Sequence, residues 1–160
     1  VNNGFSTIRF NFRGVGKSEG IYDDGEGELS DAASVLDWLQ QYNTNSKVCW
    51  VAGFSFGAWV AMQLLMRRPE LNGFVSLSPP ANMRDFSFLA PCPSSGLIVH
   101  GDKDNIASYD SSKILAEKLQ KQKKVDIKFK PIKGADHFYE NYSKELSNIV
   151  DSYIKDSLKS

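Results

Sequence analysis

Short apolar runs alternate with helix-like segments along the chain, and this alternation limits the possible folds more than any other feature. Helical spacing of apolar residues is clearest over residues 142–154. Strands joined by helices in this way form a parallel sheet with right-handed crossovers. We therefore predict one domain, residues 1–160, of the α/β class: an open, mostly parallel sheet of about five strands with helices on both faces. The predicted strands are residues 5–12, 48–54, 74–77, 97–100 and 125–132, the last alternating as an edge strand does.

Composition narrows the range of partners. A chain of 160 residues that is 41% hydrophobic can bury one core. Nineteen basic residues balance nineteen acidic ones, so no net field attracts nucleic acid or an anionic membrane surface. We expect a small-molecule partner, with no nucleic acid and no membrane.

Cysteine usage and the amino terminus indicate the compartment. Cys49 and Cys92 are too few and too distant for a disulfide framework or a zinc site, so we expect two packing residues in a reducing cytoplasm. No apolar run is long enough to span a membrane. The first ten residues lack the parts of a signal peptide, and they also lack an initiating Met. We expect a fragment of a longer protein or a non-standard start.

The stretch NFRGVGKSEG raises the question of a phosphate-binding loop. Gly16-Lys17-Ser18 matches the end of the signature G-x-x-x-x-G-K-[ST], whose amides and lysine hold nucleotide phosphates. That signature also needs a glycine where Asn11 stands and a helix that opens at the lysine. Residues 19–27 are instead acidic and glycine-rich. We therefore favour a loop at the rim of a site over a nucleotide-binding loop.

A candidate nucleophile lies in Gly53-Phe54-Ser55-Phe56-Gly57, between a predicted strand and an apolar helical segment. G-x-S-x-G in that context presents a serine hydroxyl at a strained turn, where glycines leave room for neighbouring backbone. The alternative is a helix N-cap serine flanked by packing glycines. We predict that Ser55 is the nucleophile.

A serine nucleophile needs a base, and the chain has two histidines. His137 lies in a loop after the last predicted strand, whereas His100 ends the preceding strand and must share space with the sheet edge. We predict that His137 is the base and that His100 is structural. The alternative for His137 is a loop or helix-cap histidine.

The acid that orients the base should follow a strand between Ser55 and His137. Asp102 and Asp104 both do so. Asp102 is close enough to the strand end to bond its own turn, which is the usual work of Asp at such positions. Asp104 lies further into the loop and can reach the next loop. We favour Asp104.

Four stretches, RFNFRGVGKSEG, GFSFGAWVA, HGDKDNI and GADHFY, together resemble the α/β-hydrolase superfamily. The resemblance covers nearly the whole chain and is greatest to small lidless bacterial members, similar in size to dienelactone hydrolases. The chain order serine, acid, histidine is that of α/β hydrolases. The resemblance implies that Ser55, Asp104 and His137 form a catalytic triad. It also implies that the backbone N–H of Phe56 is one oxyanion donor.

The resemblance further implies a serine hydrolase that cleaves a small ester or thioester through an acyl-enzyme, with no cofactor and no metal. Its rival is a non-catalytic relative that binds a ligand or partner in the same cleft. We predict that Phe54, Phe86 and Phe88 bind substrate, although aromatic residues at such positions often belong to the core.

The sequence departs from the family at its amino terminus. It begins just before what resembles the family's fourth strand, so the N-terminal strands and the loop with the second oxyanion donor lie upstream. In the family the third strand separates the fourth from the fifth. Residues 5–12 therefore either pair directly with residues 48–54 or leave a gap in the sheet. Because one oxyanion donor contributes about a hundred- to thousandfold in rate, we expect weak activity from this chain alone.

Overall fold

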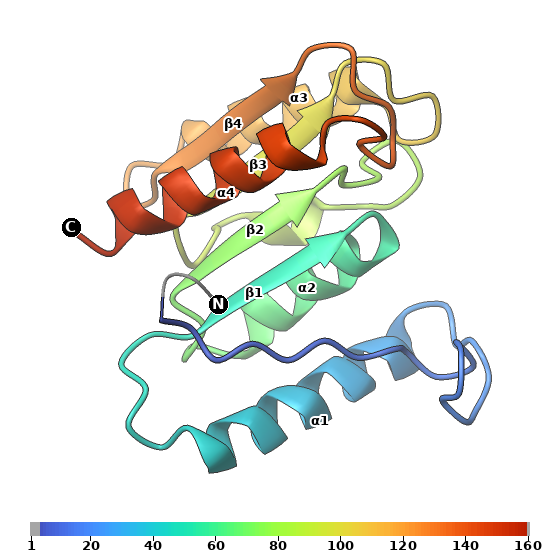
Figure 1. Cartoon of the computed structure of the whole chain (residues 1–160), viewed down its shortest axis with the longest axis vertical. Helices are drawn as coiled ribbons and strands as arrows, with labels where there is room; N and C mark the ends of the chain where they lie inside the picture. Colours follow the sequence, from blue (N-terminus) through green and yellow to red (C-terminus); the bar gives the residue numbers. More distant parts are fainter. Residues whose placement is uncertain (1–3, 160) are drawn as a thin grey trace.

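A single parallel sheet organises the computed structural model, which describes residues 4–159 (Figure 1). Residues 1–3 and 160 of the predicted domain lie outside this range. Four of the five predicted strands are confirmed, each within two residues of its expected bounds. In sheet order they are β1 (Trp50–Phe54), β2 (Gly73–Leu77), β3 (Gly96–Gly101) and β4 (Ile127–Ile132).

Helices cover both faces of the sheet, as predicted. On one face, α2 (Phe56–Arg67) and α3 (Tyr109–Gln120) pack on the strands, and α1 (Glu26–Tyr42) lies against α2. A 3₁₀ turn, η1 (Ser87–Leu89), joins this layer. On the opposite face, α4 (Ser143–Ser157) lies across β3 and β4 (Figure 1). The fold is therefore of the α/β class.

The pattern of side chains along β3 explains how one strand serves both cores. All six of its residues are buried, because helices cover the strand on both sides. Since successive side chains point to opposite faces, Ile98 joins the core with α2 and α3, whereas Leu97 and Val99 join the core with α4. The apolar stripe of α4 that completes this second core consists of Leu146, Ile149, Val150 and Tyr153.

The predicted strand at residues 5–12 is wrong. This segment has no strand assignment, and no described strand pairs with it. Ring contacts instead join the segment to the sheet and to α2: Phe5 lies 6.2 Å from Trp50 between centroids, and Phe12 lies 5.8 Å from Phe56. The apolar run thus reflects side-chain packing without a backbone ladder. In Figure 1 the segment is the blue trace between α1 and β1.

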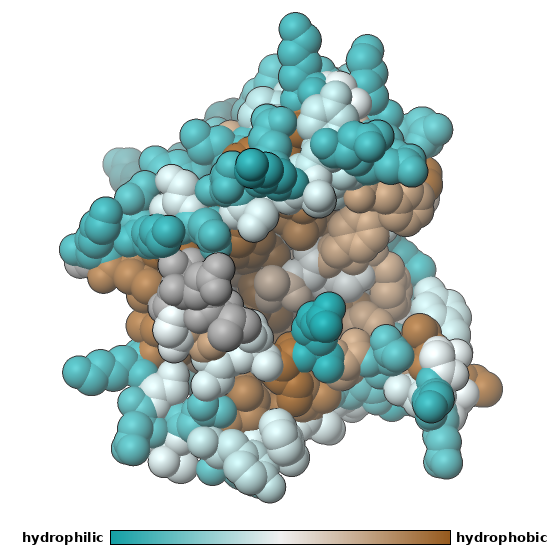
Figure 2. Space-filling view, viewed as in Figure 1, coloured by the Kyte–Doolittle hydropathy of each residue, from teal (hydrophilic) through white to brown (hydrophobic). Residues whose placement is uncertain are grey.

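The outer edge of β1 differs from the rest of the sheet as a result. In the described part of the chain β1 pairs only with β2, and its side chains are half-buried or exposed, whereas those of β3 are all buried. Apolar side chains therefore remain partly exposed near this edge, among them Ile8, Phe10 and Val48. Figure 2 shows apolar surface over the middle of this face, below the polar outer side of α4. Of the two arrangements considered for residues 5–12, the structure has the one without pairing.

Candidate active site

Ser55 lies in a sharp turn between β1 and α2. Its backbone has φ +52° and ψ −121°, a conformation that non-glycine residues rarely adopt and that functional sites often contain. The turn is held at both ends: Ser55 N–H donates to Leu77 O at 2.9 Å, and Ser55 O accepts from Ala58 N–H at 2.9 Å. The strained backbone therefore presents the hydroxyl at the carboxyl end of β1, where ligands of open α/β sheets bind.

The two glycines of the turn have different roles. A Cβ on Gly53 would lie 2.2 Å from Gly57 O, so no side chain fits there. A Cβ on Gly57 would meet nothing nearer than the Phe12 ring at 4.0 Å. The expectation that the turn excludes a Cβ is confirmed for Gly53 and is wrong for Gly57.

We expect Gly53→Ala to lower the free energy of unfolding by about 3 kcal/mol, because the added methyl overlaps a backbone carbonyl. Gly57→Ala is the matched control and should change that free energy by less than about 1 kcal/mol, since alanine is tolerated in a helix. Urea unfolding followed by circular dichroism measures both. Equal losses in the two variants would contradict the steric assignment.

Three predicted residues from separate loops meet at this edge of the sheet. His137 Nε2 lies 3.0 Å from Ser55 Oγ, and His137 Nδ1 lies 2.7 Å from Asp104 Oδ2. Because a carboxylate only accepts hydrogen bonds, Nδ1 carries the proton and Nε2 is free to accept one from the serine. The imidazole is only 3% exposed and the carboxylate is fully buried. The arrangement can thus move a proton from Ser55 Oγ to His137.

The structure also separates the two candidate acids. Asp102 Oδ1 accepts the backbone N–H of Gly134 at 2.6 Å, so this side chain closes a turn between neighbouring loops. Asp104 Oδ1 accepts the N–H groups of Ile106 and Ala107, each at 2.8 Å, which leaves Oδ2 facing His137. Asp104 reaches the imidazole and Asp102 does not, because Asp104 lies two residues further along the loop.

A buried network beneath the histidine loop escaped sequence analysis. Ser78 and Tyr139 both have positive φ, +46° and +55°. The Ser78 hydroxyl donates to Tyr139 Oη at 2.8 Å, and the phenol donates to Val99 O at 2.9 Å. These bonds tie the loop that carries His137 to the ends of β2 and β3. Nothing in the local sequence signals positive φ at a serine or a tyrosine.

Burial raises the pKa of Tyr139 from 10.0 to about 12. Below pH 10 the phenol is protonated in both the folded and the unfolded chain. Between pH 10 and 12 only the unfolded chain loses the proton, so stability falls through this window by about 2 to 3 kcal/mol. We expect Tyr139→Phe to remove this part of the alkaline destabilisation, as measured by urea unfolding at several pH values. The exposed Tyr42→Phe is the control and should leave the alkaline slope unchanged.

The backbone N–H of Phe56, the predicted oxyanion donor, belongs to the first residue of α2. The first N–H groups of a helix have no intrahelical acceptor, so this donor is free for a ligand next to Ser55. Phe54 lies beside the base, with its ring 5.0 Å from the His137 ring between centroids. Phe138, which the sequence analysis did not select, lies 6.1 Å from Phe54 and is 67% exposed. Its position directly after His137 in the sequence could have indicated that it lies beside the base.

Phe86 and Phe88 lie elsewhere. Their rings are 6.0 Å apart and stacked, and both pack in the core with η1 and α2. Phe86 is only 6% exposed. Among the described residues, the aromatic rings that contact His137 are those of Phe54 and Phe138. Of the three predicted substrate-binding residues, the structure brings only Phe54 to the candidate triad, because apolar residues of a long loop serve equally well as core.

The glycine-rich loop does not have the geometry of a phosphate site. Ser18 Oγ donates to the Asn11 carbonyl at 3.0 Å, and α1 begins only at Glu26. Arg13 anchors the loop through Asp31, with Nη2 and Oδ1 2.8 Å apart. Since no helix opens at Lys17, its N-terminal amides are not available there to hold phosphate. The structure therefore argues against a nucleotide-binding loop, and a place at the rim of the site stays a prediction.

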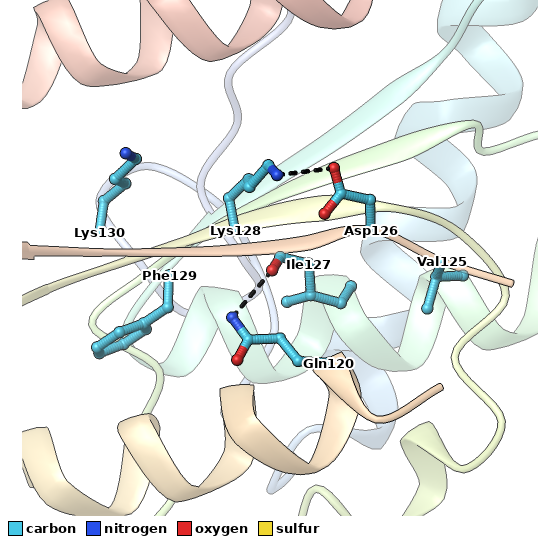
Figure 3. Close-up of a pocket in the computed structure, with 7 residues that line it drawn as sticks. All are labelled: Gln120, Val125, Asp126, Ile127, Lys128, Phe129 and Lys130. Carbon is cyan, nitrogen blue, oxygen red and sulfur yellow. Dashed lines mark hydrogen bonds and ion pairs between the residues drawn. The ribbon is translucent and has the colours of Figure 1, made fainter. Parts of the chain in front are cut away.

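Two surface hollows lie away from these residues. One, of about 360 Å³, follows the edge strand β4. Figure 3 shows Lys128 and Lys130 on one side of that strand and Ile127 and Phe129 on the other, with Lys128 paired to Asp126 at 3.0 Å. The second, of about 420 Å³, lies between α3 and the loop that carries Phe86. Neither is lined by Ser55, Asp104 or His137, so neither adds to the candidate site.

Within residues 4–159, no three His, Cys, Asp or Glu side chains gather in a way that would hold a metal ion. No helix in the same range is both long and apolar enough to cross a membrane.

The parallel sheet, the strained serine turn and the histidine loop together define the α/β-hydrolase class. Comparison with known proteins supports the same class. A family model described as X-Pro dipeptidyl-peptidase (S15 family) matches residues 1–156, and the chain belongs to this family. The relationship to lidless serine hydrolases of the superfamily, expected from the sequence, is confirmed.

Individual relatives support this assignment. A solved structure from Agrobacterium tumefaciens, described as a protein of unknown function of the α/β-hydrolase type, is 53% identical with a TM-score of 0.95 and covers 99% of this chain. A serine hydrolase without a lid from Xanthomonas campestris is 31% identical over 92% of this chain, with a TM-score of 0.80. An uncharacterised protein of Rickettsia prowazekii is 51% identical over 96% of this chain.

The chain is shorter than these relatives. It spans 66% of the Rickettsia prowazekii protein, 72% of the Agrobacterium tumefaciens chain and 64% of the Xanthomonas campestris chain. Activity, substrates and partners of the whole protein are therefore matters of proposal.

Proposed function

We propose that the protein is a serine hydrolase that cleaves a small ester or thioester through an acyl-enzyme, with Ser55, His137 and Asp104 as its triad. One observation carries the proposal: the continuous chain from Ser55 Oγ to His137 Nε2 at 3.0 Å and from His137 Nδ1 to Asp104 Oδ2 at 2.7 Å. Membership of a hydrolase family supports it.

The first half of the reaction forms the acyl-enzyme. His137 Nε2 takes the proton of Ser55 Oγ as the oxygen attacks the substrate carbonyl carbon. The negative charge then develops on the carbonyl oxygen, where the Phe56 N–H can donate a hydrogen bond. When the tetrahedral intermediate collapses, the imidazolium returns the proton to the departing alcohol or thiol. Ser55 is left as an ester of the acyl group.

The second half repeats these steps with water. His137 takes a proton from water, the resulting hydroxide attacks the acyl carbon, and the proton passes to Ser55 Oγ as the acid leaves. Asp104 stays ionised throughout and holds the Nδ1–H tautomer of the imidazole. No step requires a metal or an organic cofactor.

The surroundings of the triad favour a small apolar acyl group. Phe54 and Phe138 form an exposed aromatic wall beside His137. We take the partner to be a small ester-type molecule and exclude nucleic acid and membrane, because the charges of the chain balance. Both cysteines are free, which fits the cytoplasm of a bacterium.

A second candidate function is cleavage of an amide bond after proline, favoured by the match to a family described as X-Pro dipeptidyl-peptidase. The same triad can cleave esters, thioesters and amides, so the fold alone does not decide between these substrates. A non-catalytic relative that binds a ligand in the same cleft is the remaining rival, and the intact proton path from Ser55 to Asp104 argues against it.

Fluorophosphonate labelling followed by a substrate panel tests the proposal. We expect stoichiometric labelling of the purified protein, and turnover of p-nitrophenyl acetate and a short acyl thioester in preference to glycyl-prolyl-p-nitroanilide. Preference for the anilide would select the peptidase. Absence of both labelling and turnover, in this chain and in a version extended at the amino terminus, would select the non-catalytic reading.

A further inference from the structure

His100 does not simply fill space at the sheet edge. Its ring is fully buried in β3, and Nε2 lies 3.1 Å from Asp104 Oδ2 and 3.0 Å from Ala107 O. Both neighbours of Nε2 are oxygen atoms that only accept hydrogen bonds, so this nitrogen carries a proton and shares it between them. His100 therefore contacts the same carboxylate oxygen as His137.

The second ring nitrogen shows why His100 is a neutral donor. His100 Nδ1 is buried and has no hydrogen-bond partner in the described structure. A proton there would leave a buried N–H unsatisfied, which is unfavourable. Burial accordingly lowers the pKa of His100 below its ordinary value. The ring thus offers Asp104 one N–H without adding a full positive charge.

The contacts of Asp104 show what this N–H does. Oδ1 accepts two backbone N–H groups, from Ile106 and Ala107. Oδ2 faces both His137 Nδ1 and His100 Nε2. A carboxylate has about four acceptor positions, so these four donors occupy them all and fix the rotation of the group. Without His100, one acceptor position of a fully buried carboxylate would be empty.

Sharing Oδ2 between two imidazoles has an electrostatic effect on the base. A hydrogen bond from His100 draws negative charge away from Oδ2 and reduces its attraction for a proton on His137. The titratable groups around the pair are few: His137 comes from the β4–α4 loop, Tyr139 lies near Asp104, and Tyr109 of α3 meets the His100 ring at 6.0 Å. His100 is the one among them that contacts Oδ2 from the sheet side.

We propose that His100 is a positioning residue, which fixes the orientation of the Asp104 carboxylate and limits the negative charge that Asp104 presents to His137. The inference rests on the proposed function for its catalytic consequence. It deepens that function by assigning both histidines of the chain to one carboxylate oxygen.

Two substitutions separate this role from simple packing. His100→Phe keeps a buried ring against Tyr109 and removes the N–H. His100→Gln keeps an N–H donor at about the reach of Nε2. Because the chain has only two histidines, each variant leaves His137 as the single imidazole, and its titration by ¹⁵N NMR is free of overlap.

We expect the midpoint of the His137 titration to rise by about one unit in His100→Phe, which corresponds to a tenfold gain in proton affinity. It should stay near the wild-type midpoint in His100→Gln. The acidic limb of kcat/KM for a p-nitrophenyl ester should move in the same way, with kcat about tenfold lower in His100→Phe, KM unchanged, and most of the rate restored in His100→Gln.

An unchanged His137 titration in folded His100→Phe would overturn the proposal, as would an equal shift in His100→Gln. Should His100→Phe fail to fold, His100→Leu takes its place under the same criteria. A merely structural role would lower thermal stability without moving the titration. The NMR comparison requires no turnover. Absence of labelling and activity, in this chain and in the version extended at the amino terminus, would therefore refute the proposed function and still leave this inference decided.

Discussion

Ser55→Ala abolishes fluorophosphonate labelling and lowers ester turnover by about 10⁶-fold, if the hydroxyl held 3.0 Å from His137 Nε2 is the nucleophile. The alanine methyl fits wherever the hydroxymethyl fits, so the fold should survive. Labelling is measured by mass spectrometry of the intact protein, and turnover by release of p-nitrophenol in a steady-state assay.

A matched control distinguishes loss of the nucleophile from loss of structure. Ser87→Ala removes an exposed hydroxyl that bonds only Asp85 on the surface, and both labelling and turnover should equal those of the wild type. Retained labelling in Ser55→Ala would place the reactive serine elsewhere and reject the mechanism. The midpoint of thermal unfolding should change little in either variant.

Local patterns predicted most of the sheet because its strands are covered by helices. The runs that became β2 and β3 are mostly apolar, interrupted by Ser76 and His100, and both strands are almost wholly buried. Residues 5–12 were predicted as a strand too, although four of the eight are polar, and they pack through Phe5 and Phe12 without pairing. A ladder needs a partner strand at the right distance and register, which the composition of one segment does not specify.

The candidate site, too, could be predicted from the sequence only in part. The G-x-S-x-G motif between a strand and a helix was enough to select Ser55, and loop position was enough to select His137, because the carboxyl ends of parallel strands meet at one edge. Their convergence was not available from sequence, nor was the second contact on Asp104, since His100 was assigned only a structural place. The sequence around a histidine at a strand end is the same whether the residue only fills the core or contacts a catalytic group. Only the distances to Asp104 Oδ2 show that His100 and His137 both contact it.

The positions of the aromatic residues, in the core or beside the candidate site, were the hardest feature to predict. Phe86 and Phe88 belong to the core, whereas Phe138 is exposed beside the base. An apolar ring lowers the free energy equally well in a core or in a substrate pocket, so the residue type carries no information about which it occupies. Only the path of the connecting loop decides whether the ring lies in the core or at the site.

The second large effect is expected for Asp104→Asn. An amide at this position must keep its oxygen toward the N–H groups of Ile106 and Ala107, which turns its NH₂ toward His137 Nδ1. The imidazole then adopts the tautomer with hydrogen on Nε2, which cannot accept the serine proton. We expect kcat to fall by about 10⁴-fold with the fold intact.

Asp102→Asn is the matched control in the same loop: its side-chain oxygen can still accept the Gly134 N–H, so turnover should stay within about threefold of the wild type. Because the two aspartates follow the same strand and differ only in which neighbour they reach, equal losses in both variants would show that the loop, and not the Asp104–His137 contact, sets the rate.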